Sequence, residues 1–158
     1  MKRMIKNGFT LIELLVVISV IGILVSLAFV SFTQSQKQAR DVQRKSDLRQ
    51  YQNALENFAN GNNSLFPART GASVSASTTL CTGLNAYFDP DITCPEDPKG
   101  SPTYKYRSNG TEGTVSATVY VLWAQLESDP TFYWVVCSNG RAGQTNTGIP
   151  PAAGTCPI

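Results

Sequence analysis

One long apolar run dominates the first third of the chain. Between Leu14 and Phe32 no residue is charged, and the only polar side chains are three serines. At ~1.5 Å rise per residue, a helix of this length can cross a hydrocarbon core, whereas strands rarely exceed about ten residues. The run therefore predicts a transmembrane helix over residues 9–32.

A helical pattern of mixed residues continues beyond this run. The apolar positions that recur at helical spacing are Leu48, Tyr51, Leu55 and Phe58, with Val42 as a further candidate. No proline or glycine interrupts this region before Gly61, which suits a left-handed position at the end of a helix. The pattern predicts an amphipathic extension over residues 33–60, whose apolar stripe packs on the rest of the protein.

Residues 61–158 predict a small globular head. Residues 61–102 have the composition of an irregular connection, and three segments then favour strands: 103–107, 114–126 and 131–137. A Gly- and Pro-rich tail follows from residue 138. The expected fold class is α+β, in which a long N-terminal helix packs on a small antiparallel sheet.

Four cysteines fall within the predicted head: Cys81, Cys94, Cys137 and Cys156. None has CxxC spacing, and because the chain has no histidine, a zinc site would need all four. Two disulfides are favoured, with Cys81–Cys94 and Cys137–Cys156 preferred because they close short local loops. The other pairings and free thiols remain alternatives. Disulfides indicate an oxidising location.

The segment before the apolar run resembles the charged region of a secretory signal. Lys2, Arg3 and Lys6 precede it, but Phe29–Phe32, where a signal peptide would be cut, offers no small-x-small site. A small residue, Gly8, lies on the other side of the run. This arrangement predicts a leader, residues 1–8, that is removed while the apolar helix stays with the mature protein.

The residues Gly8-Phe9-Thr10-Leu11-Ile12-Glu13 resemble the cleavage and methylation signature of type IV pilins and the related secretion pseudopilins. The resemblance implies that a prepilin peptidase cuts between Gly8 and Phe9 and methylates the amine of Phe9. It also implies self-association into a filament whose core is the apolar helix. Further implied partners are the membrane, an inner-membrane assembly platform and an assembly ATPase.

Glu13 is a charged side chain inside the apolar run, where burial in lipid costs roughly 2.5–3.5 kcal/mol on insertion scales. After cleavage the Phe9 amine would lie about one helical turn away. We expect the amine of one subunit to pair with Glu13 of a neighbour and set the register of assembly. The alternative is that Glu13 only extends to the lipid headgroups.

Other chemistry has little support in the sequence. Without histidine or a nucleophile–base motif, no enzymatic activity and no cofactor are expected. An acidic loop could hold calcium, although a plain surface turn is favoured over this weak candidate site: Asp89, Asp91, Glu96 and Asp97. The basic run 37–49 could contact DNA or anionic lipid, but a solvated or subunit-facing surface is favoured, and no specific nucleic acid is expected.

The sequence therefore indicates a type IV pilus-like structural subunit, with a secretion pseudopilin as the alternative and a membrane-anchored surface binding protein as a second alternative. The stretch Asp97–Tyr106 resembles a pseudopilin head, whereas two disulfides and a long tail favour the pilus. The basic run after the apolar segment would place the following residues in the cytoplasm by charge count. The leader motif and the cysteines favour the opposite, a single-pass protein with its head outside the cytoplasm.

Overall fold

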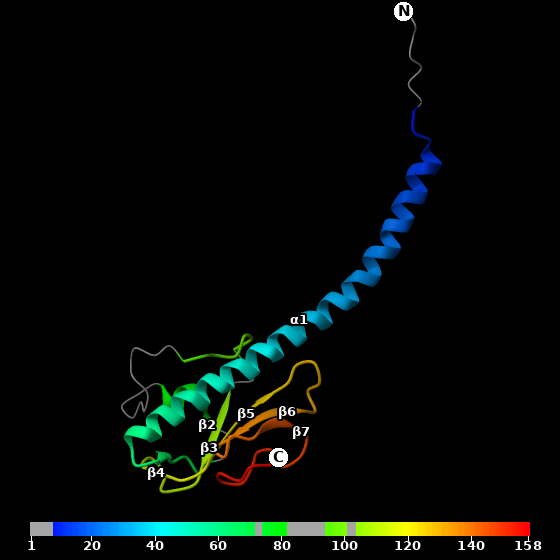
Figure 1. The fold of residues 1–158 in the computed structure, drawn as a ribbon. Helices are drawn as coiled ribbons and strands as arrows, with labels where there is room; N and C mark the ends of the chain where they lie inside the picture. Colours follow the sequence, from blue (N-terminus) through cyan, green and yellow to red (C-terminus); the bar gives the residue numbers. More distant parts are fainter. Residues whose placement is uncertain (1–7, 72–73, 82–93, 101–103) are drawn as a thin grey trace, which may run out of the picture. The chain divides into compact units, whose positions relative to one another are not determined.

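The computed structural model describes residues 8–71, 74–81, 94–100 and 104–158, without the side chains of residues 27–31. The chain divides into two compact units, one ending at Lys37 and the other formed by Gln38–Ile158. Its elements, labelled in Figure 1, are α1 (Leu11–Gly61), β1 (Phe66–Pro67), β2 (Val74–Ser75), α2 (Ala76–Leu80), β3 (Lys105–Ser108), β4 (Val115–Ala117), β5 (Tyr120–Gln125), β6 (Tyr133–Cys137) and β7 (Ala142–Thr145).

The first unit is helical from Leu11 onward. The predicted helix is confirmed, but it begins two residues after Phe9, because Thr10 occupies the position before the first helical residue. Within the part of the chain that the structure describes, no helix combines the length and apolarity that a membrane crossing requires.

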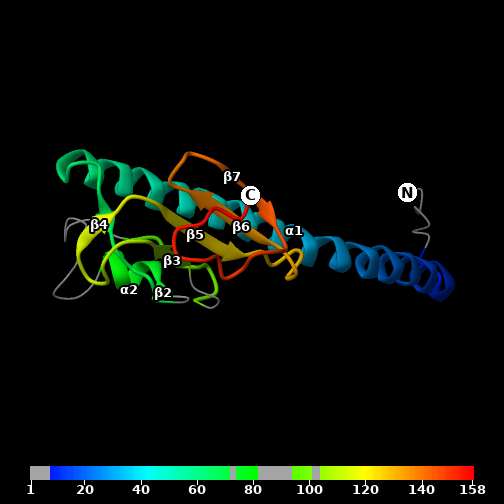
Figure 2. The ribbon, with the colours of Figure 1, turned by 90° about the horizontal axis from the view of Figure 1, so that it is seen from below.

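The second unit confirms the predicted α+β fold. Five antiparallel strands form one sheet in the order β2-β3-β5-β6-β7, and β1 pairs with β4 in a separate two-stranded sheet. From Gln38 on, α1 lies along one face of the larger sheet (Figures 1 and 2). Its side chains Leu48, Tyr51 and Leu55 are buried in one cluster with Tyr106, Tyr120, Leu122 and Val136 of the sheet.

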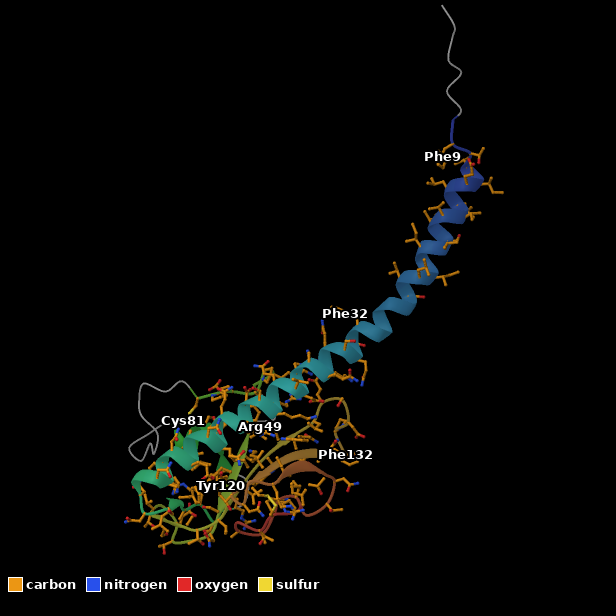
Figure 3. All side chains as sticks on the ribbon, in the orientation of Figure 1. Phe9, Phe32, Arg49, Cys81, Tyr120 and Phe132 are labelled. Carbon is orange, nitrogen blue, oxygen red and sulfur yellow. A yellow bond between two sulfur atoms is a disulfide. The ribbon has the colours of Figure 1, made fainter. Side chains whose placement is uncertain are left out.

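Tyr120 shows how the polar tip of an aromatic residue is accommodated in this interface. Its ring packs edge-on against Phe66 with centroids 4.7 Å apart, and its hydroxyl donates a hydrogen bond to Glu56 of α1 at 3.0 Å. Figure 3 labels it among the side chains between helix and sheet. Val42, in contrast, is 64% exposed, so its predicted place in the apolar stripe is wrong.

The C-terminal tail covers the other face of the sheet. Val121, Trp123 and Val135 form a second buried cluster, against which Ile149, Cys156 and Ile158 of the tail pack. Both faces of β5 are therefore buried, one under α1 and one under the tail. The tail also contributes strand β7, which the sequence did not predict.

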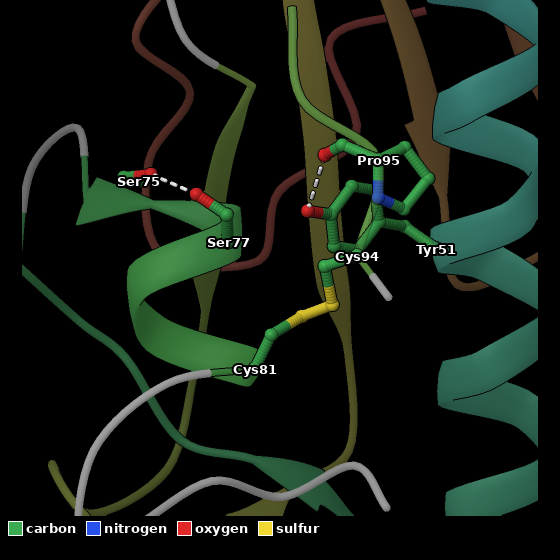
Figure 4. The surroundings of a disulfide bond; sticks show 6 residues. All are labelled: Tyr51, Ser75, Ser77, Cys81, Cys94 and Pro95. Carbon is green, nitrogen blue, oxygen red and sulfur yellow. Dashed lines mark hydrogen bonds between the residues drawn. A yellow bond between two sulfur atoms is a disulfide. The ribbon is translucent and has the colours of Figure 1, made fainter. Parts of the chain in front are cut away.

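Both expected disulfides, Cys81–Cys94 and Cys137–Cys156, are present. Cys137 ends β6, and its bond to Cys156 fixes the tail on the second cluster, with the two Cα atoms 5.8 Å apart. The other disulfide joins the end of α2 to the segment that begins at Cys94 (Figure 4). There the Tyr51 hydroxyl of α1 donates a hydrogen bond to the carbonyl oxygen of Pro95 at 2.8 Å.

Removing the second disulfide should destabilise the head. Cys137→Ser with Cys156→Ser is expected to lower the free energy of unfolding by about 3 kcal/mol, because the unfolded chain gains the freedom of an open loop. Urea denaturation of the full chain in detergent measures this, with Thr155→Ala as a matched control in the same exposed part of the tail. An unchanged midpoint in the double variant would show that packing alone holds the tail.

The C-terminal end of α1 differs from the prediction. The helix does not end with Gly61 in a left-handed conformation; instead Asn63 and Ser64 have positive φ of 54° and 61°. The Ser64 amide then donates to the carbonyl of Ala59 at 2.9 Å, which satisfies one of the last helical carbonyls. Asparagine tolerates this conformation better than most residues.

The predicted strand 114–126 is divided into β4 and β5, which belong to different sheets. The break lies at Thr118 and Val119, whose backbone amides both donate to the side-chain oxygen of Asn109. An asparagine side chain thus replaces strand partners at this point. The alternation of apolar residues continues across the break and does not reveal it.

Candidate functional site

The segment Gly8–Glu13 begins outside the helix and ends within its first turn. Gly8 is exposed, and a Cβ added to it would meet no other atom within 4 Å. Phe9 is 86% exposed. Among the residues that the structure describes, packing therefore leaves room for a larger side chain at position 8.

Thr10 and Glu13 cap the start of α1 reciprocally. The Thr10 backbone amide and hydroxyl donate to Oε2 of Glu13 at 2.9 and 2.7 Å. In return, the Glu13 amide donates to Oγ1 of Thr10 at 3.3 Å. This arrangement is a capping box, which satisfies amides that a helix start leaves unpaired.

Thr10 was not among the site residues expected from the sequence. A Thr-x-x-Glu spacing directly before an apolar run is the signal that could have revealed the cap. Within a single chain Glu13 therefore already has a local partner. Its expected pairing with the Phe9 amine of a neighbouring subunit stays a prediction, and it would add to this cap or compete with it.

Removing the Thr10 hydroxyl should loosen the first turn of α1. Thr10→Ala is expected to accelerate hydrogen exchange of the Glu13 amide by about fivefold, since loss of such a cap typically costs about 1 kcal/mol. Exchange measured by NMR on the full chain in detergent micelles tests this. Thr10→Ser keeps the hydroxyl and should retain the slower rate; equal rates in wild type and Thr10→Ala would argue against the cap.

The helix that follows exposes its apolar side chains on all sides. Every large apolar side chain from Leu11 to Val25 is at least 45% exposed, and they project around the whole circumference beyond Phe9 (Figure 3). The hydroxyls of Ser19 and Ser26 donate hydrogen bonds to backbone carbonyl oxygens of the same helix. The surface that this segment offers to its surroundings is therefore almost entirely apolar.

A second constellation in the head, which we call the ion cluster, comprises three cations and three anions: Arg40, Asp41, Arg44, Asp97, Lys99 and Glu127. At its centre, Arg44 donates to both carboxylate oxygens of Asp97 at 2.6 and 3.0 Å and to Asp41 at 2.9 Å. The side chains of Arg44 and Asp97 are 1% and 0% exposed. The hydrogen bond to Asp97 raises the pKa of Arg44, so its charge is permanent.

Glu127 and Asp41 connect the turn between β5 and β6 to α1. Arg40 donates two hydrogen bonds to Glu127 at 2.6 and 2.7 Å, and Lys99 lies 2.5 Å from the same carboxylate. Asp41 accepts the backbone amides of Glu127 and Ser128 at 2.7 and 2.9 Å. The hydrogen bond from Arg40 is the largest of the effects that lower the pKa of Glu127 to about 2.

This pKa predicts how stability depends on pH. Since the folded-state pKa of Glu127 lies below its ordinary value of 4.5, its ionised pairing stabilises the head fully above about pH 4.5 and is lost as the pH falls toward 2. The wild type should therefore unfold more readily as the pH is lowered through this range. The urea midpoints of wild type and Glu127→Gln should become equal as the pH falls from about 4.5 toward 2. A difference between the midpoints that stays constant over this range would contradict the lowered pKa of Glu127.

The ion cluster changes the interpretation of the basic run. Arg40 and Arg44 face the head, so the predicted solvated or subunit-facing surface is wrong for these two residues, and neither offers a free charge to DNA or lipid. Within α1, Arg44 pairs with Asp41, three residues earlier in the helix. Asp47 instead accepts a hydrogen bond from the Tyr104 hydroxyl at 2.5 Å, and burial raises its pKa.

The weak calcium candidate gains no support from the residues that can be placed. Asp89 and Asp91 lie outside the described residues, and Asp97 is paired with Arg44. Glu96 is exposed. Across residues 8–71, 74–81, 94–100 and 104–158, no group of three or more His, Cys, Asp or Glu side chains could hold a metal ion.

An apolar helix with a capped start, followed by a disulfide-closed head of helix and antiparallel sheet, is consistent with a pilin-like fold. Residues 3–29 match the family model described as the prokaryotic N-terminal methylation motif. The chain therefore carries the prepilin-type signal of type IV pilins and pseudopilins. No curated protein and no solved structure matched the chain.

Proposed function

We propose that this chain is a non-enzymatic structural subunit of a type IV pilus-like filament, with a role in adhesion, motility or DNA uptake. One observation carries the proposal: the prepilin-type signal is joined directly to a helix whose apolar side chains are exposed on all sides from Leu11 to Val25. Such a surface must be buried by lipid or by other proteins, because large exposed apolar patches are unfavourable in water.

The order of events follows from this surface. Before assembly, lipid would cover the helix and anchor the chain in the membrane. After a prepilin peptidase cuts between Gly8 and Phe9, helices of other copies would replace the lipid in the filament core. The new Phe9 amine would pair with Glu13 of a neighbour, which removes an isolated charge from an apolar setting.

The head supports an exported location. Its two disulfides are typical of oxidising compartments, so we place it outside the cytoplasm, with the assembly platform and assembly ATPase acting at the inner membrane. In the filament the loop closed by Cys137–Cys156 would be presented at the surface, where Asn146, Thr147 and Gly148 are exposed. The proposal requires no cofactor.

A secretion pseudopilin is the second candidate, because it would carry the same signal. The resemblance of the stretch Asp97–Tyr106 to a pseudopilin head favours it, and Asp97 and Lys99 of this stretch form ion pairs in the ion cluster.

Deletion of the chain from its own cells distinguishes the two functions. A pilus subunit predicts that surface filaments disappear while export of folded proteins into the medium continues. Immunogold labelling with an antibody against the head should decorate filaments along their length. Intact filaments together with lost protein export would favour the pseudopilin, and intact filaments with normal export would contradict both.

A further inference from the structure

The face that α1 presents to the head changes its chemistry abruptly between residues 47 and 48. On the N-terminal side its buried side chains are charged: Asp41, Arg44 and Asp47. On the C-terminal side they are apolar or aromatic: Leu48, Tyr51, Leu55 and Ala59. Helical spacing places both sets on one stripe, so a single docking face consists of an ionic half and an apolar half.

The ion cluster joins this half of α1 to two separate segments of the head, while Asp47 accepts a hydrogen bond from Tyr104. Asp97 belongs to the segment that starts at the Cys81–Cys94 disulfide, and its carboxylate also accepts the amide of Lys99 at 2.9 Å. Glu127 and Ser128 belong to the turn between β5 and β6. Carboxylate and guanidinium groups make the contacts between these segments and α1. The cluster has three positive and three negative charges, so its net charge is zero.

The two halves of the docking face differ in what separation from the head would do. Apolar side chains that leave the core lose their burial and gain nothing from water. When a set of charges with zero net charge leaves the head, it loses the free energy of its ion pairs but regains the free energy of hydration. For buried ion pairs these two free energies roughly cancel. Detachment of the ion cluster should therefore cost much less than detachment of the apolar half.

We propose that the ion cluster is a latch that opens as one unit, releasing residues 40–44 of α1 from the head while Asp47, Leu48, Tyr51 and Leu55 keep the head attached. In the open form the β5–β6 turn and residues 97–99 separate from residues 40–44, the hydrogen bond from Tyr51 to Pro95 stays in place, and all six charges of the cluster are hydrated together. This conformational device goes beyond the filament role and does not depend on it.

Two backbone amides report directly on the latch. Glu127 and Ser128 donate their amide hydrogens to Asp41 of α1. Both hydrogen bonds cross from the head to the helix, so they break when the latch opens even if the sheet stays intact. The amides of central strand β5, which lies between β3 and β6, report on unfolding of the sheet itself.

Hydrogen exchange measured by NMR on the full chain in detergent micelles tests the proposal. The Glu127 and Ser128 amides should exchange at least tenfold faster than the β5 amides, with rates that depend little on low concentrations of urea. Exchange of all these amides at one common rate with one common urea dependence would overturn the proposal, because the latch would then open only when the head unfolds.

Variants separate a latch from a rigid anchor. Arg44→Met with Asp97→Leu removes one charge of each sign, so the remaining four charges stay balanced; exchange at Glu127 and Ser128 should then stay within about threefold of wild type or become slower. Arg44→Met alone leaves an unpaired carboxylate and should accelerate exchange more than tenfold. Arg49→Met, on the exposed face of α1, is the control and should change nothing. Equal acceleration by the single and double variants would overturn the proposal.

Discussion

Replacement of Glu13 by alanine is expected to leave membrane insertion and cleavage intact but to abolish filament assembly or reduce it severely. The carboxylate would pair with the Phe9 amine of a neighbouring subunit, and an apolar surrounding makes an unpaired amine unfavourable. Electron microscopy of sheared filaments measures assembly, and the gel mobility of the processed chain measures cleavage.

Two companion variants separate the charge of Glu13 from its role as a helix cap. Glu13→Gln keeps an acceptor that suits a capping box but removes the charge, so it should fail to assemble as Glu13→Ala does. Ser19→Ala alters another polar residue of the same helix and should assemble normally. Normal filaments from Glu13→Gln would show that Glu13 serves only to cap α1.

Replacement of Arg44 by methionine should have the largest effect on stability. The change leaves the buried carboxylates of Asp97 and Asp41 without their central cation, and removal of one partner from a buried ion pair typically costs about 3–5 kcal/mol. We therefore expect a loss of up to this size in the free energy of unfolding of the head, measured by urea denaturation of the full chain in detergent. Its upper limit is the free energy of opening the latch, because the open form hydrates both carboxylates.

The matched control for this experiment is Arg49→Met, which removes the same side chain from an exposed position five residues further along α1. Its effect should stay within about 0.5 kcal/mol, as for most surface substitutions. If the two variants were equally stable, the ion cluster would not be the buried and mutually dependent set of charges that the geometry indicates.

The periodicity of apolar residues was sufficient to predict the long helix and its docking on a sheet. Leu48, Tyr51 and Leu55 recur at helical spacing, and all three are fully or almost fully buried. The disulfide pairing could also be predicted, because the short loops between neighbouring cysteines favour it. These features depend on interactions that are local in the sequence or repeat along one element.

The ion cluster could not be predicted in the same way, because its members are brought together from three distant segments. Arg44 and Asp97 are 53 residues apart in the sequence, and charged residues on a helix are usually solvated. One hint was present: Asp41 and Arg44 continue the spacing of the apolar stripe toward the N-terminus. The division of the strand at Asn109 depends on equally distant contacts.

The candidate site at the start of α1 was predicted in part. The positions of Gly8, Phe9 and Glu13 followed from the motif, whereas the cap formed by Thr10 required attention to helix termini rather than to hydropathy. Because of this cap, Glu13 is not an unpaired charge before assembly. Its carboxylate has a partner within its own chain before processing, and cleavage would supply a second, cationic one.

Mass spectrometry of sheared surface filaments tests the central claim most directly. If the chain is a processed filament subunit, the filaments should contain it, it should begin at Phe9, and the amine of Phe9 should carry a methyl group. Filaments that lack the chain, or that contain it with residues 1–8 still attached, would contradict the account.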